Sequence, residues 1–313
     1  MQFRSTIALL VAALGAASAC RKAEPAPQQK PAEVAAPAAA APAPAPAPAP
    51  AVIAKPLLWE VEKDGKQLQL LGTFHLGVDA ARELPPWVWQ RFDAAHTFAM
   101  EADVMDPSLL AALRRTDGTT LDQELGAAHW AKLEQAIGAD TAARLKTLAA
   151  SAVTTVVMTH GLPPTAPMDM TLLERARAGG KAIVYLEPVD VQVRVLRWLD
   201  GTTLKAMLDD LDGTRARNEK GLAVFRSGDA AAMAEMVAPA EWKAMFRRSD
   251  AEVAQAMDEM LYRRNASWIA GIEKLVAAGD AFVAVGAGHL VGDRSVIDLL
   301  LAKGYSVTRV IGQ

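Results

Sequence analysis

Two histidines in this sequence stand in the same local setting. His75 and His289 each end a Gly-x-x-His sequence that directly follows an apolar, strand-like run. Glycine there allows a sharp turn or a close approach of the backbone, and open α/β sheets place their sites at strand ends. Either motif alone is more simply a turn capped by an imidazole, but the repetition favours one site for metal ligation or proton transfer. The remaining histidines have polar, helical or helix-terminal neighbours and are predicted to lie at the surface: His96, His129 and His160.

Two glutamates also follow apolar runs typical of strands. Glu101 comes after residues 97–100, and Glu187 comes after residues 183–186. A buried carboxylate is costly unless it is paired, so each of them either reaches solvent beside a lysine or arginine or meets a cation inside the protein. If the strands are neighbours in one sheet, both acids and both histidines converge at one edge. Two histidines and one glutamate are a ligand set for zinc or another divalent transition metal such as manganese or cobalt, and the second glutamate could be a general base.

Three further polar residues are candidates for supporting roles. Arg264 and Asn265 project from a late helix and could hold a substrate carbonyl or carboxylate, although a solvated helix face is the alternative. Asp169 precedes Thr171 and Glu174, whose spacing matches a capping box. That pattern predicts a structural role for Asp169 near the start of a helix.

The pattern of apolar residues predicts one α/β domain that positions these side chains. Asp-Gly at residues 64–65 between two strand-like runs indicates a β-hairpin. We expect a central mixed β-sheet that opens with this hairpin, flanking helices, and a large helical insertion before and after the fourth strand. The predicted strands are residues 57–61, 68–73, 97–100, 182–186, 282–285 and 306–311, and the predicted helices lie within residues 86–95, 121–159, 170–178 and 189–278.

Composition limits the chemistry that is available. The 313 residues are 51% hydrophobic, which allows a large core, and the formal net charge of -3 argues against a nucleic-acid partner. Cys20 is the only cysteine, so the folded part has no disulfide or cysteine nucleophile. Any metal must therefore bind to histidine, aspartate or glutamate.

The N-terminal sixth of the chain has the features of an export leader and a tether. Residues 1–20 contain an apolar run and end in small residues before Cys20, which resembles a lipobox and predicts a signal peptide with a lipid-anchored cysteine. Residues 21–54 are rich in proline and alanine and are predicted to be a disordered linker before a domain at residues 55–313. We expect an exported, periplasmic protein held by lipid on Cys20. Arg21, rather than an aspartate, follows Cys20, which permits an outer-membrane location for the anchored protein. Without lipidation the protein would be secreted.

Six ordered motifs resemble the TraB/PrgY/GumN family over residues 57–311. They are Leu-Gly-Thr-Phe-His-Leu-Gly, Met-Glu-Ala-Asp, Pro-Met-Asp, Leu-Glu before Gln192, Arg-Asn, and Val-Gly-Ala-Gly-His-Leu-Val-Gly. The resemblance implies kinship with the Tiki proteins, membrane-tethered metalloproteases that clip Wnt ligands, and more distantly with erythromycin esterases and haem-binding lipoproteins. It implies essential, metal-dependent roles for His75, His289 and Glu101. The Tiki activity belongs to animal relatives, so the resemblance supports a fold and a site better than a substrate.

These observations lead us to expect an exported metal-dependent hydrolase that acts on a peptide amide bond. A metal held by His75, Glu101 and His289 would activate water, Glu187 would move the proton, and Arg264 would stabilise the oxyanion. One alternative is a metal-free esterase in which a histidine is the general base. The other is a non-catalytic periplasmic protein that binds a peptide or small molecule.

Overall fold

The computed structural model describes residues 52–312, so the predicted signal peptide, Cys20 and nearly all of the predicted linker lie outside the described residues. Ile53 is buried, and its N–H donates a hydrogen bond to the carbonyl of Glu83 at 2.8 Å. The folded part therefore includes Ile53, just before the predicted boundary. Within residues 52–312, no helix combines the length and the apolar character that crossing a membrane requires.

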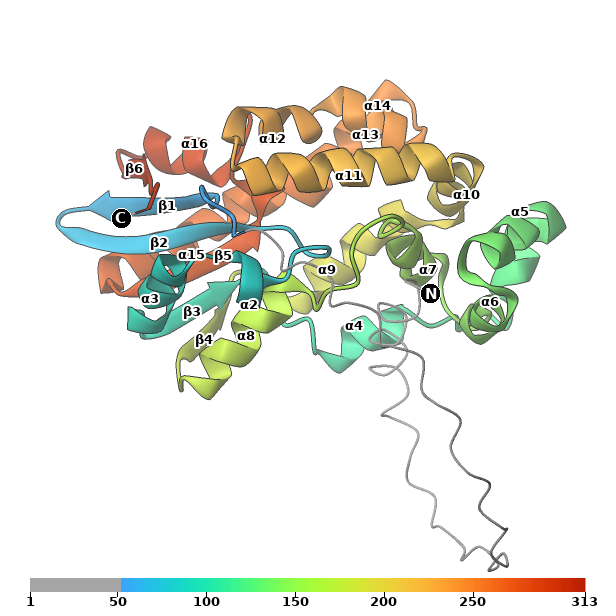
Figure 1. The fold of residues 1–313 in the computed structure, drawn as a ribbon, viewed down its shortest axis with the longest axis horizontal. Helices are drawn as coiled ribbons and strands as arrows, with labels where there is room; N and C mark the ends of the chain where they lie inside the picture. The colour runs from blue at the N-terminus through green and yellow to red at the C-terminus, as the bar shows by residue number, and fades with distance from the viewer. Residues whose placement is uncertain (1–51, 313) are drawn as a thin grey trace, which may run out of the picture.

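A six-stranded mixed sheet forms one end of the molecule (Figure 1). The strand order is β4-β3-β5-β2-β1-β6, in which β4, β3, β5 and β2 are parallel and β1 runs antiparallel to β2 and β6. The predicted α/β class and the six predicted strands are confirmed. The strands are β1 (Leu58–Lys63), β2 (Lys66–Thr73), β3 (Thr97–Met100), β4 (Ala182–Tyr185), β5 (Ala281–Gly286) and β6 (Ser306–Arg309).

The hairpin between β1 and β2 has the predicted turn. Asp64 and Gly65 both have positive φ, 55° and 72°, as a two-residue turn that matches the twist of the strands requires. Lys63 pairs with Lys66 directly beside the turn. The turn therefore fixes the register of the strand that leads to His75.

Helices cover the sheet and form the rest of the molecule. In Figure 1, α5, α6, α7 and α10 lie at the end far from the sheet. The helices are α2 (Ala80–Glu83), α3 (Pro86–Ala94), α4 (Pro107–Ala112), α5 (Leu121–Ile137), α6 (Ala139–Leu145), α7 (Ala150–Val157), α8 (Met168–Ala178), α9 (Val189–Val195), α10 (Gly201–Asp209), α11 (Leu211–Ser227), α12 (Ala230–Met236), α13 (Pro239–Phe246), α14 (Asp250–Met257), α15 (Arg263–Ala278) and α16 (Val296–Ala302), with 3₁₀ turns η2 (Leu196–Leu199) and η4 (Ala287–His289) and a π-helical turn η3 (Asp258–Tyr262).

The predicted helical stretches 121–159 and 189–278 each contain a series of shorter helices, because residues such as Gly138 take a backbone conformation that a helix cannot continue through. One sequence-based prediction about the helices is corrected. The predicted capping box at Thr171 is wrong. Helix α8 starts three residues earlier, at Met168, and the Thr171 hydroxyl donates to the carbonyl of Pro167 within the helix.

The sheet and the helical insertion have separate apolar cores. Around the sheet, Phe92 of α3 lies 5.4 Å from Phe98 and 5.0 Å from Phe282 between ring centroids, and Trp268 of α15 is fully buried. A second cluster joins α5, α6, α7 and α10. The insertion therefore contributes its own core rather than extending that of the sheet.

Gly228, at the end of α11, is needed for a close approach to the chain at Lys55. Its φ is 68°, and a Cβ there would lie 1.8 Å from the Lys55 carbonyl oxygen. Gly180 has nearly the same φ, 67°, but a Cβ would meet no atom within 4 Å. We expect Gly180→Ala to lower the free energy of unfolding by about 1 kcal/mol, and Gly228→Ala by at least about 2 kcal/mol more, because only the second adds a steric clash. Urea unfolding of both variants tests this, and equal losses would contradict it.

Candidate active site

The sheet topology brings four predicted site residues to one edge. Strands β2, β3, β4 and β5 are parallel neighbours, so their carboxyl ends lie together. His75, Glu101, Glu187 and His289 lie just beyond those four ends. The site is thus assembled from segments far apart in the sequence, at the sheet edge where open α/β folds bind ligands.

The glycine of each Gly-x-x-His motif makes room for the other motif. A Cβ on Gly72 would lie 3.2 Å from the Cα of Ala287, which follows Gly286. A Cβ on Gly286 would lie 3.1 Å from His75 Nε2 and 3.4 Å from Glu101 Oε1. The contacts at 3.1 and 3.2 Å are tighter than nearly all real Cβ contacts, so the glycines let the two loops approach one another.

His75 is the accessible member of the site, and Asp169 orients it. The side chain is 61% exposed, and its Nδ1 lies 2.6 Å from Asp169 Oδ2. Asp169 also accepts a hydrogen bond from the Thr73 hydroxyl at 2.8 Å, and its neighbour Met168 donates a backbone hydrogen bond to the His75 carbonyl. The charge of Asp169 raises the pKa of His75 to about 9 against the opposing effect of desolvation.

His289 is the buried member, and Asn265 orients it. Only 5% of the residue is exposed. Its Nδ1 lies 2.6 Å from Asn265 Oδ1, an atom that can only accept, so Nδ1 carries the proton and Nε2 is left as an acceptor. Burial lowers the pKa of His289 to about 3, despite the nearby charge of Glu101. The imidazole is therefore neutral over the physiological pH range.

Arg264 connects the buried groups. This residue follows the π-helical turn η3, a type of turn frequent at functional sites. The guanidinium is stacked on Trp268, with 4.9 Å from Cζ to the ring centroid. All five of its N–H groups have acceptors. These are both carboxylate oxygens of Glu187, Glu101 Oε2 at 2.6 Å, the Met260 carbonyl at 3.0 Å and His289 Nε2 at 3.2 Å.

The two glutamates differ in how they are held. Glu101 accepts from the Gly286 N–H at 2.8 Å as well as from Arg264. Burial acts to raise the pKa of Glu101, but the nearby cations, above all Arg264, hold it well below its usual range. Glu187 is almost fully buried and accepts from Arg264, from Gln192 at 2.8 Å and from the Trp268 indole at 2.9 Å. These contacts favour a role for Glu187 in positioning Arg264 rather than in carrying a proton.

The donor atoms suit a divalent metal, but Arg264 already contacts two of them. Within residues 52–312, no three or more His, Cys, Asp or Glu side chains are grouped as ligands of one ion. The donor set nevertheless fits a metal. Asp169 and Asn265 contact the Nδ1 atoms of His75 and His289, as the partners of metal-binding imidazoles do, and Glu101 supplies oxygen beside these rings. An ion bound by His75, Glu101 and His289 would have to replace the contacts that Arg264 makes with His289 and Glu101.

The other histidines are outside this site. His96 is exposed and His129 is partly exposed, and both contact aspartates. The predicted surface position of His160 is wrong, because only 8% of it is exposed. It lies in the loop after α7, where its carbonyl accepts a hydrogen bond from the side chain of Asn218 in α11. Sequence reasoning also missed the contact of Asp169 with His75, although the Pro-Met-Asp motif singled that residue out.

Asp169→Asn should lower the pKa of His75 from about 9 towards its ordinary 6.5, because the main charge that raises it is removed. The raised pKa in the folded state means that protonation of His75 stabilises the wild type below about pH 6.5, and that this contribution is lost as the pH rises through about 9. Imidazole NMR titration of chelator-treated protein measures the shift. Asp93→Asn, at a surface carboxylate paired with Arg175, is the control. An unchanged His75 pKa in Asp169→Asn would contradict the assignment.

Arg264→Gln should lower the free energy of unfolding by about 3–5 kcal/mol, because it leaves buried Glu187 without its cation. The double variant Arg264→Gln/Glu187→Gln should recover part of that loss, since no charge then remains at position 187. Arg263→Gln is the matched control, because Arg263 is the adjacent residue and its side chain is 72% exposed. We expect a change within about 0.5 kcal/mol for it in urea unfolding. A similar effect at both arginines would contradict the buried network.

Comparison with known proteins links these residues to a family. A metalloprotease TIKI homolog of Amphimedon queenslandica is 28% identical over 166 residues, which are 46% of this chain and 32% of that protein. The match therefore spans about a third of the relative's length. No solved structure matches the chain significantly. The model of the TraB/PrgY/gumN family matches residues 57–309, which include all the candidate site residues, and the chain belongs to this family.

Proposed function

We propose that this protein is a hydrolase that cleaves amide bonds in peptides. The observation that carries the proposal is the convergence of two oriented imidazoles, those of His75 and His289, with Glu101 and Arg264 at the carboxyl edge of a parallel sheet. The similarity to a metalloprotease homolog supports the amide bond as the target and a metal as the cofactor. Zinc, manganese and cobalt all suit this donor set.

His75, Glu101 and His289 would hold the metal, and a bound divalent ion would polarise the scissile carbonyl and lower the pKa of water. Asp169 and Asn265 fix the two imidazole rings from behind. Arg264 supplies a fixed positive charge beside Glu101, and Glu187 keeps it there. Since every N–H of Arg264 already has a partner, it would contact a substrate oxygen directly only by giving one of them up.

The His75–Asp169 pair supports a second candidate, hydrolysis of an ester without a metal. In this arrangement Asp169 orients His75 for proton transfer, and the exposure of the ring lets a substrate reach it. The contacts of Arg264 with His289 and Glu101 remain in place. Sensitivity to chelators separates the two candidates.

We also propose that the domain works outside the cytoplasm, as the leader-like residues 1–20 and the lipobox-like Cys20 indicate. A lipid on Cys20 followed by the proline-rich linker would hold the domain away from a periplasmic membrane surface. Peptides or small molecules of that compartment would then be its substrates. Mass spectrometry of the mature N-terminus in a bacterial host tests this, and an unprocessed Met1 would contradict it.

Peptide hydrolysis tests the proposed activity. We expect wild-type protein to cleave members of a mixed peptide library, detected by mass spectrometry, and His75→Ala or His289→Ala to reduce cleavage at least about 10²-fold. His96→Ala is the control, because that exposed histidine lies outside the site. A chelator should abolish cleavage and added divalent metal should restore it. Unchanged cleavage by His75→Ala would contradict the site, whereas ester cleavage that resists the chelator would select the metal-free candidate.

A further inference from the structure

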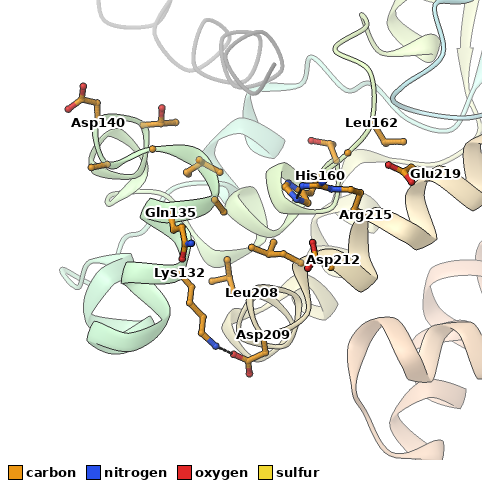
Figure 2. A pocket seen from close by; sticks show the side chains of 18 residues that line it. Lys132, Gln135, Asp140, His160, Leu162, Leu208, Asp209, Asp212, Arg215 and Glu219 are labelled. Carbon is orange, nitrogen blue, oxygen red and sulfur yellow. Dashed lines mark hydrogen bonds and ion pairs between the residues drawn. The ribbon is translucent and has the colours of Figure 1, made fainter. Parts of the chain in front are cut away.

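A cavity of about 1100 Å³ lies between the helical insertion and α11 (Figure 2). No residue of the cluster around Arg264 lines it. Its walls are the end of α5 and the start of α6, the loop after α7, and the junction of α10 with α11. A cavity of this size accommodates a ligand as large as a short peptide segment. None of the six predicted site residues lines it.

The lining has an excess of negative charge. Among the described residues that line it, the carboxylates are Asp140, Asp209, Asp212 and Glu219, and the cations are Lys132 and Arg215. Two positive and four negative charges give a formal net charge of -2. Lys132 Nζ lies 2.6 Å from Asp209 Oδ1, which leaves three carboxylates and Arg215 to determine the potential inside the cavity. That potential favours a cationic ligand.

His160 and Arg215 give the cavity fixed polar groups as well as charge. Arg215 donates to His160 Nε2 at 3.0 Å, and Figure 2 shows the two side chains together between the ends of the cavity. Burial, aided by Arg215, lowers the pKa of His160, so this imidazole is neutral and accepts the hydrogen bond. Gly161 leaves the space for Arg215, because a Cβ there would lie 2.5 Å from Arg215 Cγ. An exposed guanidinium held in this way can donate to peptide carbonyls.

The cavity is physically connected to the loop that carries His75. Leu162, which lies at the same end of the cavity as Glu219 in Figure 2, packs on Gly77, where an added Cβ would lie 3.2 Å from the leucine side chain. Thr165, which lies in the loop after α7 with Leu162, accepts a hydrogen bond from the Gly77 N–H at 3.0 Å. Gly77 is two residues after His75, so the Leu162 end of the cavity lies next to the loop that carries His75.

We propose that this cavity binds the part of a peptide substrate that lies away from the scissile bond, and that it selects segments with lysine or arginine side chains. The inference rests on the proposed peptide hydrolysis and adds the class of substrate. Carboxylates at Asp140, Asp212 and Glu219 would meet the cationic side chains, and Arg215 would meet the peptide backbone.

Peptide binding tests this site separately from hydrolysis. Full-length His75→Ala protein is titrated into three fluorescent octapeptides that alternate alanine with lysine, glutamine or glutamate, and anisotropy gives each Kd. We expect the lysine peptide to bind at least about tenfold more tightly than the glutamate peptide, with a preference that weakens as salt is added. Equal affinities would overturn the proposal.

A pair of variants with equal charge changes locates the binding. Asp212→Asn/Glu219→Gln should weaken binding of the lysine peptide at least about fivefold. Glu174→Gln/Asp250→Asn removes two exposed carboxylates outside the cavity and should change it less than about twofold. Equal weakening by both pairs would overturn the site. If wild type cleaves peptides without this charge dependence, the cavity proposal is wrong and the proposed hydrolase function stands. If the cavity binds the lysine peptide but no peptide is cleaved, the cavity proposal stands and the proposed hydrolase function is wrong.

Discussion

The parallel pairing of β2 with β5 is the constraint on which the site depends. It sets Thr73 opposite Gly286, so the loops that follow these strands leave the sheet side by side. Glycine at positions 72 and 286 then lets the backbones and His75 approach to distances at which a methyl group would be in unusually tight contact. Each Gly-x-x-His motif is therefore explained by its neighbour. Two histidines more than two hundred residues apart in sequence form one cluster because the strands that precede their loops are paired neighbours in the sheet.

A buried network around Arg264 then fixes the polar side of that cluster. Its guanidinium is the cation that allows Glu101 and Glu187 to be buried as charges, and it also holds His289 through Nε2. A fully partnered arginine is a rigid source of positive potential, which suits a site that must stabilise developing negative charge. His75, by contrast, stays exposed and is held from behind by Asp169, so it is the member of the cluster that solvent reaches.

The sequence was sufficient to predict the sheet and its polar edge, since apolar runs of strand length ended in His75, Glu101, Glu187 and His289. It was insufficient wherever a long-range contact decided the outcome. Asp169 had a local explanation as part of a helix start, and its true partner is 94 residues away. His160 had polar neighbours in sequence, but the loop after α7 folds it against α11. The pattern and spacing of apolar residues predict the local backbone, whereas the positions of Asp169 and His160 depend on packing between segments distant in sequence.

The proposed metal site requires that the two Gly-x-x-His loops bind a single ion. Metal analysis of the full chain after dialysis against a small excess of zinc, manganese or cobalt tests it most directly, with His75→Ala, His289→Ala and a control, His129→Ala, measured in parallel; His129 is partly exposed and lies outside the site. We predict one bound ion per wild-type or His129→Ala chain and none in either of the other variants, because each loop supplies a ligand to the same ion. An ion retained by either single-loop variant, or no ion in the wild type, would contradict it.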